Sequence, residues 1–228
     1  FEIHRSRVVE NEHDVRFDGA AAAHRHAGDV GDCRSGRNGN AELDGEEAAV
    51  AAVQEGRLGI VREVSVQRYG PMRASRSPWQ MDLATAGSGV LGGLGVHVID
   101  FVHWVVGDRI ARVFGLAYPG RATGRPDESV TLVLEFAGGC QAAIRCGRGL
   151  PIGTNDLQVF GTRGMLTTGP LRWGPTDSLT VKTMDGTKER EFPRENLYQR
   201  EIEALAEEVA GNQTAAATGE DGVWLARV

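Results

Sequence analysis

Cysteine, lysine and long apolar runs are all scarce in this 228-residue sequence. The three cysteines, Cys33, Cys140 and Cys146, form an odd set without C-x-x-C spacing, which argues against a disulfide framework and a cysteine zinc site. The longest strongly apolar stretch, residues 96–106, is shorter than the ~20 residues of a membrane span and contains two histidines and an aspartate. The first five residues lack the order of a signal peptide. We expect reduced thiols, a cytoplasmic location and no membrane partner.

Basic charge is too dispersed for a general nucleic-acid binder. The 25 Lys and Arg residues are outnumbered by 31 Asp and Glu, which gives a net charge of -6. Binding to phosphates needs clustered positive charge, so we expect no nucleic-acid partner. The apolar fraction of 41% is ordinary for a globular protein and allows a sizeable core.

Residues 1–43 lack a sustained helical or strand period and read as an irregular or poorly ordered segment. They hold four of the six histidines, which are His4, His13, His24 and His26. The spacing of these histidines suits no single helix face, and no carboxylate set accompanies them. We therefore predict no metal site.

Residues 44–228 alternate helix and strand signals and are predicted to form one domain whose last helix is cut by the chain end. Strand patterns occupy residues 60–69, 110–118, 130–136, 141–146, 157–161, 165–168, 179–182 and 189–192. Helix patterns occupy residues 44–56, 87–107, 198–211 and 218–224, and residues 70–86 read as a long loop. Short glycine-bearing turns pair successive strands antiparallel. The prediction is an α+β fold, a largely antiparallel open sheet with helices packed on one face.

The glycine turn before the second predicted helix matches the residue pattern of a dinucleotide-binding fingerprint but not its structural context. Gly87-x-Gly89-x-x-Gly92 satisfies G-x-G-x-x-G. That fingerprint holds a pyrophosphate when a buried strand leads into it and further βαβ units follow. Here the preceding seven residues are not a strand, and an antiparallel series follows. We predict that the glycines permit a sharp helix entry and close packing, and that no residue of this sequence binds a dinucleotide cofactor.

The helix after this turn carries the candidate chemistry. His97 and Asp100 are three residues apart and can face one groove. A carboxylate beside a histidine fixes its tautomer and raises its basicity, as a general base requires. A histidine that is only hydrogen-bonded in the core is the competing interpretation. His103 is expected to pack near the helix end. About 120° of helix rotation separates it from His97, so the two histidines are not expected to share a metal ion.

Five ordered motifs resemble the glucose-fructose oxidoreductase / inositol dehydrogenase / MocA (Gfo/Idh/MocA) family over residues 44–228. They are the strand entry Gly56–Val64, His97–Asp100 and Trp104–Gly107 on one helix, the turn Gly161–Gly164, and the late Glu220-Asp221-Gly222. The resemblance implies the substrate-binding C-terminal domain of an oxidoreductase that uses NAD or NADP on a sugar, polyol or related hydroxylated substrate. The nucleotide-binding Rossmann domain is expected to be absent from this sequence.

The resemblance also implies roles for particular residues. His97 would contact the substrate hydroxyl and help to move its proton, with Asp100 beside it, while Arg76, Trp79 and Asp82 could line the substrate pocket or be solvated loop residues. It further implies a homo-oligomer formed through the sheet face.

Two departures from the family pattern favour an alternative, a non-catalytic sugar-binding or oligomerisation module. Many family dehydrogenases have an aspartate four residues before the histidine, and this chain has Gly93 there. They also use a lysine from an E-K-P motif, whereas Lys182 and Lys188 lie in a distal hairpin.

Overall fold

The computed structural model describes residues 45–71, 77–120, 123–151, 153–169, 171, 176–193, 196–212, 214 and 217–228. The predictions for residues 1–43, for the helix cap Asp44 and for the pocket residue Arg76 lie outside the described residues.

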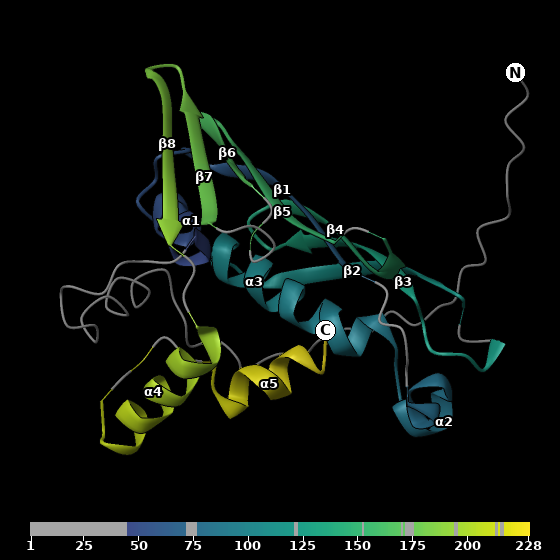
Figure 1. Cartoon of the computed structure of the whole chain (residues 1–228). Helices are drawn as coiled ribbons and strands as arrows, with labels where there is room; N and C mark the ends of the chain where they lie inside the picture. The colour runs from purple at the N-terminus through teal and green to yellow at the C-terminus, as the bar shows by residue number, and fades with distance from the viewer. Residues whose placement is uncertain are drawn as a thin grey trace, which may run out of the picture.

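One mixed, mostly antiparallel sheet of eight strands dominates the fold (Figure 1), in the order β2-β3-β4-β1-β5-β6-β7-β8. The strands are β1 (Val61–Pro71), β2 (Ile110–Tyr118), β3 (Ser129–Phe136), β4 (Gln141–Leu150), β5 (Thr154–Gly161), β6 (Gly164–Thr168), β7 (Thr176–Thr183) and β8 (Gly186–Pro193). All neighbours pair antiparallel except β1 and β4, which are parallel. The predicted open, largely antiparallel sheet is confirmed.

The parallel β1–β4 pair was not predicted, and chain order explains it. The segment between the two strands contains four helical elements and the β2–β3 hairpin, so the chain is long enough to return and run beside β1 in the same direction. β1 therefore lies at the centre of the sheet, between β4 and β5. Within the described residues there is no doubly wound series of βαβ units.

Side-chain alternation divides the sheet into a buried and an outer face. Along β3 every second residue from Val130 to Phe136 is buried, and β5 buries Leu157 and Val159 in the same way. Burial of one such apolar side chain stabilises the folded state by about 1.5–3 kcal/mol. Figure 1 shows the helices on one side of the sheet, as predicted. The core lies between them and the sheet.

Two helices form the layer against the sheet. α1 (Gly45–Gln54) contacts β6 and β7, and α3 (Val96–Val106) contacts β1 and β4. Glycines in left-handed backbone conformations follow both helices: Gly56 has φ +69° and Gly107 has φ +68°. The sequence predicts that the two helices end at these glycines, and the structure agrees. α5 (Gly219–Leu225) begins at Thr218, which caps it through Asp221, as its pattern predicts.

The segment predicted as a long loop contains short helical elements. These are the 3-10 turn η1 (Pro78–Met81) and α2 (Leu83–Ala86), and a π-helical turn, η2 (Leu91–Gly95), leads into α3. The prolines that suggested a loop are compatible with this outcome, because Pro78 stands at the first helical position, where no amide donor is needed. The prediction was wrong for residues 78–86.

One helical run, Leu83–Val106, is long and apolar enough by length and composition to cross a membrane, although the sequence predicts no segment of that length. Gly87, with φ +72°, separates α2 from the rest of this run. Val98, Ile99, Val102 and Val105 of its second half are buried in the same core as the sheet. The second half of the run, α3, is therefore a core helix, while 33% of the most apolar stretch as a whole is buried.

α4 (Leu197–Val209) does not pack on the sheet, which contradicts the prediction for residues 198–211. Its apolar stripe is exposed, with Tyr198, Ile202, Leu205 and Val209 all at least 60% accessible. An ion pair between Arg200 and Glu47 of α1, 3.4 Å long, links the helix to the body of the fold. The stripe has the spacing of a packing face, but within the described part of the chain no surface covers it.

Candidate functional site

The glycine turn is held by the carboxylate of Asp127 from the β2–β3 connection. The amides of Gly89 and Leu91 donate to its two oxygens at 2.8 and 2.7 Å, and the Val90 amide donates to its backbone oxygen at 2.9 Å. A side chain at position 89 would collide with the Asp127 backbone, so only glycine allows this approach. The amide donors at the start of the helical run are thus engaged by the protein itself, and the turn provides the sharp, closely packed helix entry that the sequence predicts.

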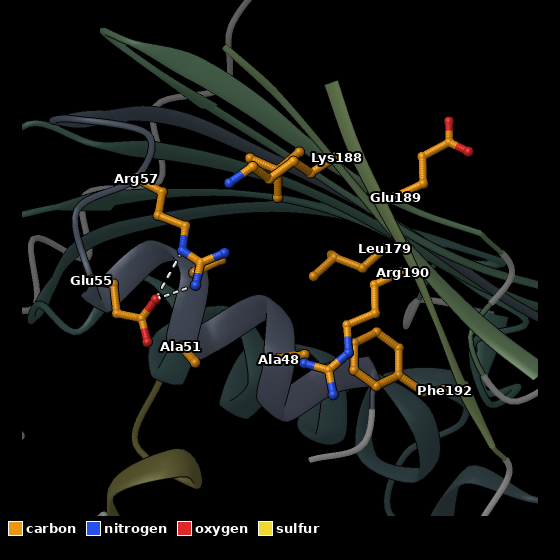
Figure 2. Close-up of a pocket in the computed structure, with 11 residues that line it drawn as sticks. Ala48, Ala51, Glu55, Arg57, Leu179, Lys188, Glu189, Arg190 and Phe192 are labelled. Atoms are coloured by element: carbon orange, nitrogen blue, oxygen red, sulfur yellow. Dashed lines mark hydrogen bonds and ion pairs between the residues drawn. The ribbon is translucent and has the colours of Figure 1, made fainter. Parts of the chain in front are cut away.

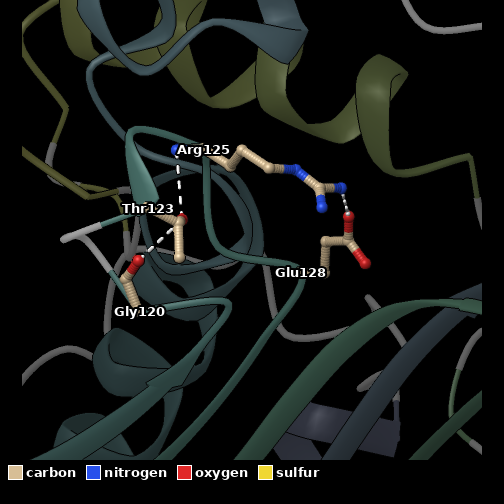
Figure 3. A network of polar contacts seen from close by, with 4 residues as sticks. All are labelled: Gly120, Thr123, Arg125 and Glu128. Carbon is tan, nitrogen blue, oxygen red and sulfur yellow. Dashed lines mark hydrogen bonds and ion pairs between the residues drawn. The ribbon is translucent and has the colours of Figure 1, made fainter.

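Local polar contacts shape the connection that carries Asp127 (Figure 3). The Thr123 hydroxyl donates to the Gly120 carbonyl at 2.8 Å and accepts from the Arg125 amide at 3.3 Å. Arg125 pairs with Glu128 at 2.9 Å. These contacts order the chain on both sides of Asp127.

His97 is exposed on the first turn of α3, and Asp100 is half-buried one turn later. The buried stripe of the helix consists of other residues, so His97 is not a core histidine. The structure therefore places the imidazole where a ligand can reach it. The proton-transfer role of the pair stays a prediction.

His103 has the packing role expected of it. Its ring lies 4.1 Å from that of Trp224 in α5, centroid to centroid, at an interplanar angle of 32°. This contact joins the end of α3 to the last helix.

The predicted pocket residues Trp79 and Asp82 lie on a separate pair of short helices. Trp79 in η1 is 58% exposed. Asp82 is the N-cap of α2, and its carboxylate accepts from the amides of Ala84 and Thr85. The structure gives Asp82 a structural role, while a contact of either residue with substrate stays a prediction.

An arginine that no sequence motif marks lies close to the histidine helix. The side chain of Arg148 in β4 passes Gly70, and its guanidinium lies against Gly93, where an added Cβ would stand 2.8 Å from Nη2. Gly93 is one helical turn before His97. No local motif marks this pair, because the two residues come from elements far apart in the sequence.

A separate groove of about 350 Å³ lies between α1 and the β7–β8 hairpin (Figure 2). Its floor is apolar, with Ala48, Leu179 and Phe192 among the lining residues, and Arg190 lies 4.7 Å over the Phe192 ring. At its edge Arg57 pairs with Glu55 at 2.7 Å. None of the predicted site residues lines this groove.

The two described cysteines are buried thiols of low reactivity. Burial, with the nearby charges of Asp108 and Glu63, raises the pKa of Cys140 to about 11. Burial also raises the pKa of Cys146 to about 11, against the opposing effect of Arg68. Among the residues that the structure covers, no His, Cys, Asp and Glu group is suited to a metal ion.

Comparison with known proteins gives consistent matches. The model of the GFO/IDH/MocA C-terminal domain matches residues 47–167. The 1,5-anhydro-D-fructose reductase of Ensifer adhaerens is 26% identical over 177 residues, 76% of this chain and 53% of the relative. The chain thus spans about half the length of that relative.

Solved structures share the fold at lower identity. The aldose-aldose oxidoreductase from Caulobacter crescentus, complexed with glycerol, superposes with a TM-score of 0.67 at 21% identity, over 80% of this chain and 55% of that one. A levoglucosan dehydrogenase in complex with NADH and L-sorbose superposes with a TM-score of 0.52 at 20% identity, over 64% of this chain and 43% of that one.

Proposed function

This chain belongs to the Gfo/Idh/MocA family of oxidoreductases, and from that membership we propose that it is the substrate-binding part of an NAD(P)-dependent enzyme. Its substrate is a sugar, a polyol or a related hydroxylated compound. The proposal is supported by relatives named for such substrates, an anhydrofructose reductase and a levoglucosan dehydrogenase bound to L-sorbose.

The exposed imidazole of His97 is the observation that carries the proposal. It stands on a helix anchored to the sheet by four buried side chains, so its position is fixed while its ring stays accessible. A histidine so placed can accept the proton of a substrate hydroxyl as the alcohol is oxidised, or return it as a ketone is reduced. Asp100 on the same helix is proposed as its positioning carboxylate.

The nicotinamide cofactor does not fit the glycine turn of this chain. A pyrophosphate needs open amide donors at a helix start, and here the amides of Gly89 and Leu91 already donate to Asp127. We place the cofactor on a nucleotide-binding domain outside the described residues. The cofactor would supply the hydride chemistry, while this chain binds and orients the substrate.

Assembly through the outer face of the sheet is part of the same proposal. Phe114, Leu116 and Tyr118 of β2 and Val133 of β3 lie on this face and are between 43% and 71% exposed. An apolar strand face of this kind suits a second copy of the chain. We also propose a cytoplasmic location, with neither nucleic acid nor membrane as a partner.

Ligand titration tests the binding role. We expect myo-inositol or D-glucose to shift the amide signals of α3 in NMR spectra of the 228-residue chain, and His97→Ala to weaken that binding, with Lys188→Ala in the groove as the matched control. NADH fluorescence should show no saturable binding to this chain. Failure of all neutral sugars, polyols and their acidic derivatives to bind would contradict the proposal.

The alternative is a non-catalytic module that binds a sugar or assembles without turnover. Gly93 favours it, since the resemblance leads us to expect a carboxylate at that position. The discriminating experiment is turnover with a nucleotide-binding domain supplied upstream of this chain. Activity that His97→Ala abolishes supports the enzyme, and absence of activity with retained sugar binding supports the module.

A further inference from the structure

One glycine, Gly93, makes room for the guanidinium of Arg148 beside the histidine helix, while Gly70 lies at ordinary contact distance from the stem of the same side chain. Its Cγ lies 3.9 Å from where a Cβ of Gly70 would stand, and its Nη2 lies 2.8 Å from where a Cβ of Gly93 would stand. The arginine thus extends from β4 over β1 to the π-helical turn η2, which contacts β4. A larger residue at position 93 would have to displace the guanidinium.

A second arginine lies on the same face of the sheet. Arg68 of β1 pairs in register with Cys146, two residues before Arg148, and Gly70 pairs with Arg148. Arg68 follows the buried Val64 and Val66 in alternation, so it lies on the side that the helices cover. Two arginines of adjacent strands therefore lie on this face, two residues apart in register, and Arg148 reaches η2.

His97 follows Gly93 by four residues, about one turn along the same helical run. The positive charge and the proposed proton-transferring imidazole thus lie within the span of a small hydroxylated molecule. A neutral sugar needs no cation for recognition. A guanidinium matches the paired oxygens of a carboxylate or phosphate and binds them more strongly than it binds a hydroxyl.

We propose that Arg148, with Arg68 beside it, binds an anionic group of the substrate, so that the ligand is an acidic sugar or polyol derivative carrying a carboxylate or phosphate. This inference rests on the proposed substrate-binding function and names its substrate class. His97 would then face a hydroxyl of the same molecule, with the anionic group anchored one turn away.

Three probes of one sugar framework test the inference by calorimetric titration of the 228-residue chain: D-glucose, D-glucuronate and D-glucose 6-phosphate. The acidic probes should bind at least about tenfold more tightly than glucose, the gain expected of a charge-assisted hydrogen-bonded pair. The tighter of the two acidic probes distinguishes a carboxylate from a phosphate. Arg148→Gln should remove the preference for the acidic probes over glucose, whereas Arg148→Lys should retain part of it.

Two further variants separate recognition from structural support. Arg145→Gln changes an exposed arginine of the same strand on the outer face and should leave the preference intact. Gly93→Asp places a carboxylate against the guanidinium of an intact Arg148 and should abolish the preference, with thermal unfolding as the check that the variant folds.

Each remaining outcome has a definite meaning. Equal affinity for glucose and both acidic probes, or a preference that survives Arg148→Gln, overturns the inference and leaves the proposed function standing. Absence of binding by all three probes overturns both the inference and the sugar-binding function on which it rests.

Discussion

At the scale of single residues, Asp127 shows how one side chain can decide what a motif does. The glycine pattern of residues 87–92 has the letters of a phosphate-binding turn, yet the amides of Gly89 and Leu91 donate to this carboxylate. A carboxylate at the start of a helical run is stabilised by those donors and by the helix dipole. The anion that the turn binds is therefore part of the protein.

Replacing Asp127 should destabilise the fold. Asp127→Ala leaves two amide donors without their acceptor, and we expect it to lower the free energy of unfolding by about 1–3 kcal/mol. Urea denaturation followed by circular dichroism measures the loss. Asp185→Ala at the exposed β7–β8 turn is the matched control and should change stability by no more than about 0.5 kcal/mol. Equal effects of the two variants would show that the Asp127 contacts contribute nothing specific.

The buried thiols make a second prediction at this scale. A pKa near 11 in place of 9.0 leaves about 100-fold less thiolate at neutral pH, so iodoacetamide should label Cys140 and Cys146 far more slowly in the folded than in the urea-unfolded chain. Peptide mass spectrometry assigns the labelled positions. Labelling of either cysteine at the unfolded rate would contradict its burial.

The same two pKa values predict how stability depends on pH. Between pH 9 and about 11 the unfolded chain loses the thiol protons that the folded chain retains, so the free energy of unfolding should fall as pH rises through this window. Below pH 9 both states are protonated and the thiols contribute no slope. The double variant Cys140→Ala with Cys146→Ala should show a shallower decline than the unmodified chain.

At the scale of secondary-structure elements, the two long helices after β1 differ in what holds them. Val98, Ile99, Val102 and Val105 of α3 are each no more than 5% exposed, whereas the stripe of α4 is open to solvent. Amphipathic spacing reveals that a helix has an apolar face but does not identify the surface that covers it. That is why residues 198–211 were correctly predicted as a helix and wrongly predicted to pack on the sheet.

Hydrogen exchange should reveal this difference. Because local opening of α4 exposes little additional apolar surface, we expect its amides to exchange at least about 100-fold faster than those of α3. Arg200→Ala removes the ion pair to Glu47 and should speed exchange in α4 while leaving α3 unchanged. Equal protection of both helices, measured by mass spectrometry, would contradict the prediction.

Most of the strands could be predicted from the sequence because period-2 burial is a local property. β2 was placed at its observed bounds, and β3 differs by one residue at its start. The parallel pairing of β1 with β4 and the contacts of Asp127 and Arg148 join segments far apart in the chain, and no local pattern encodes such partners. The candidate site was predicted only where its residues share one helix, as His97 and Asp100 do.

At the scale of the whole molecule, the outer sheet face is the surface that we propose for assembly. Phe114 and Leu116 are each 64% exposed on the edge strand β2, on the face opposite the helices. We expect the chain to form a dimer or larger oligomer, and the paired change Phe114→Glu and Leu116→Glu to yield monomers, because charge would be buried at the interface. Light scattering after size-exclusion chromatography measures the mass. Met184→Glu at the β7–β8 tip, where Met184 is 97% exposed, is the control that should not change it.

The central position of β1 has a consequence for how the chain acquires its structure. Both of its neighbours, β4 and β5, follow the β2–β3 hairpin, so β1 is synthesised well before either of them. Until Gln141 and the residues after it have left the ribosome, Val64 and Val66 have no strand beside them, and loop closure must bring these distant segments together first. A nascent chain that ends at Phe136 would hold the central strand of the sheet unpaired on both edges, and such a fragment should bind chaperones and aggregate.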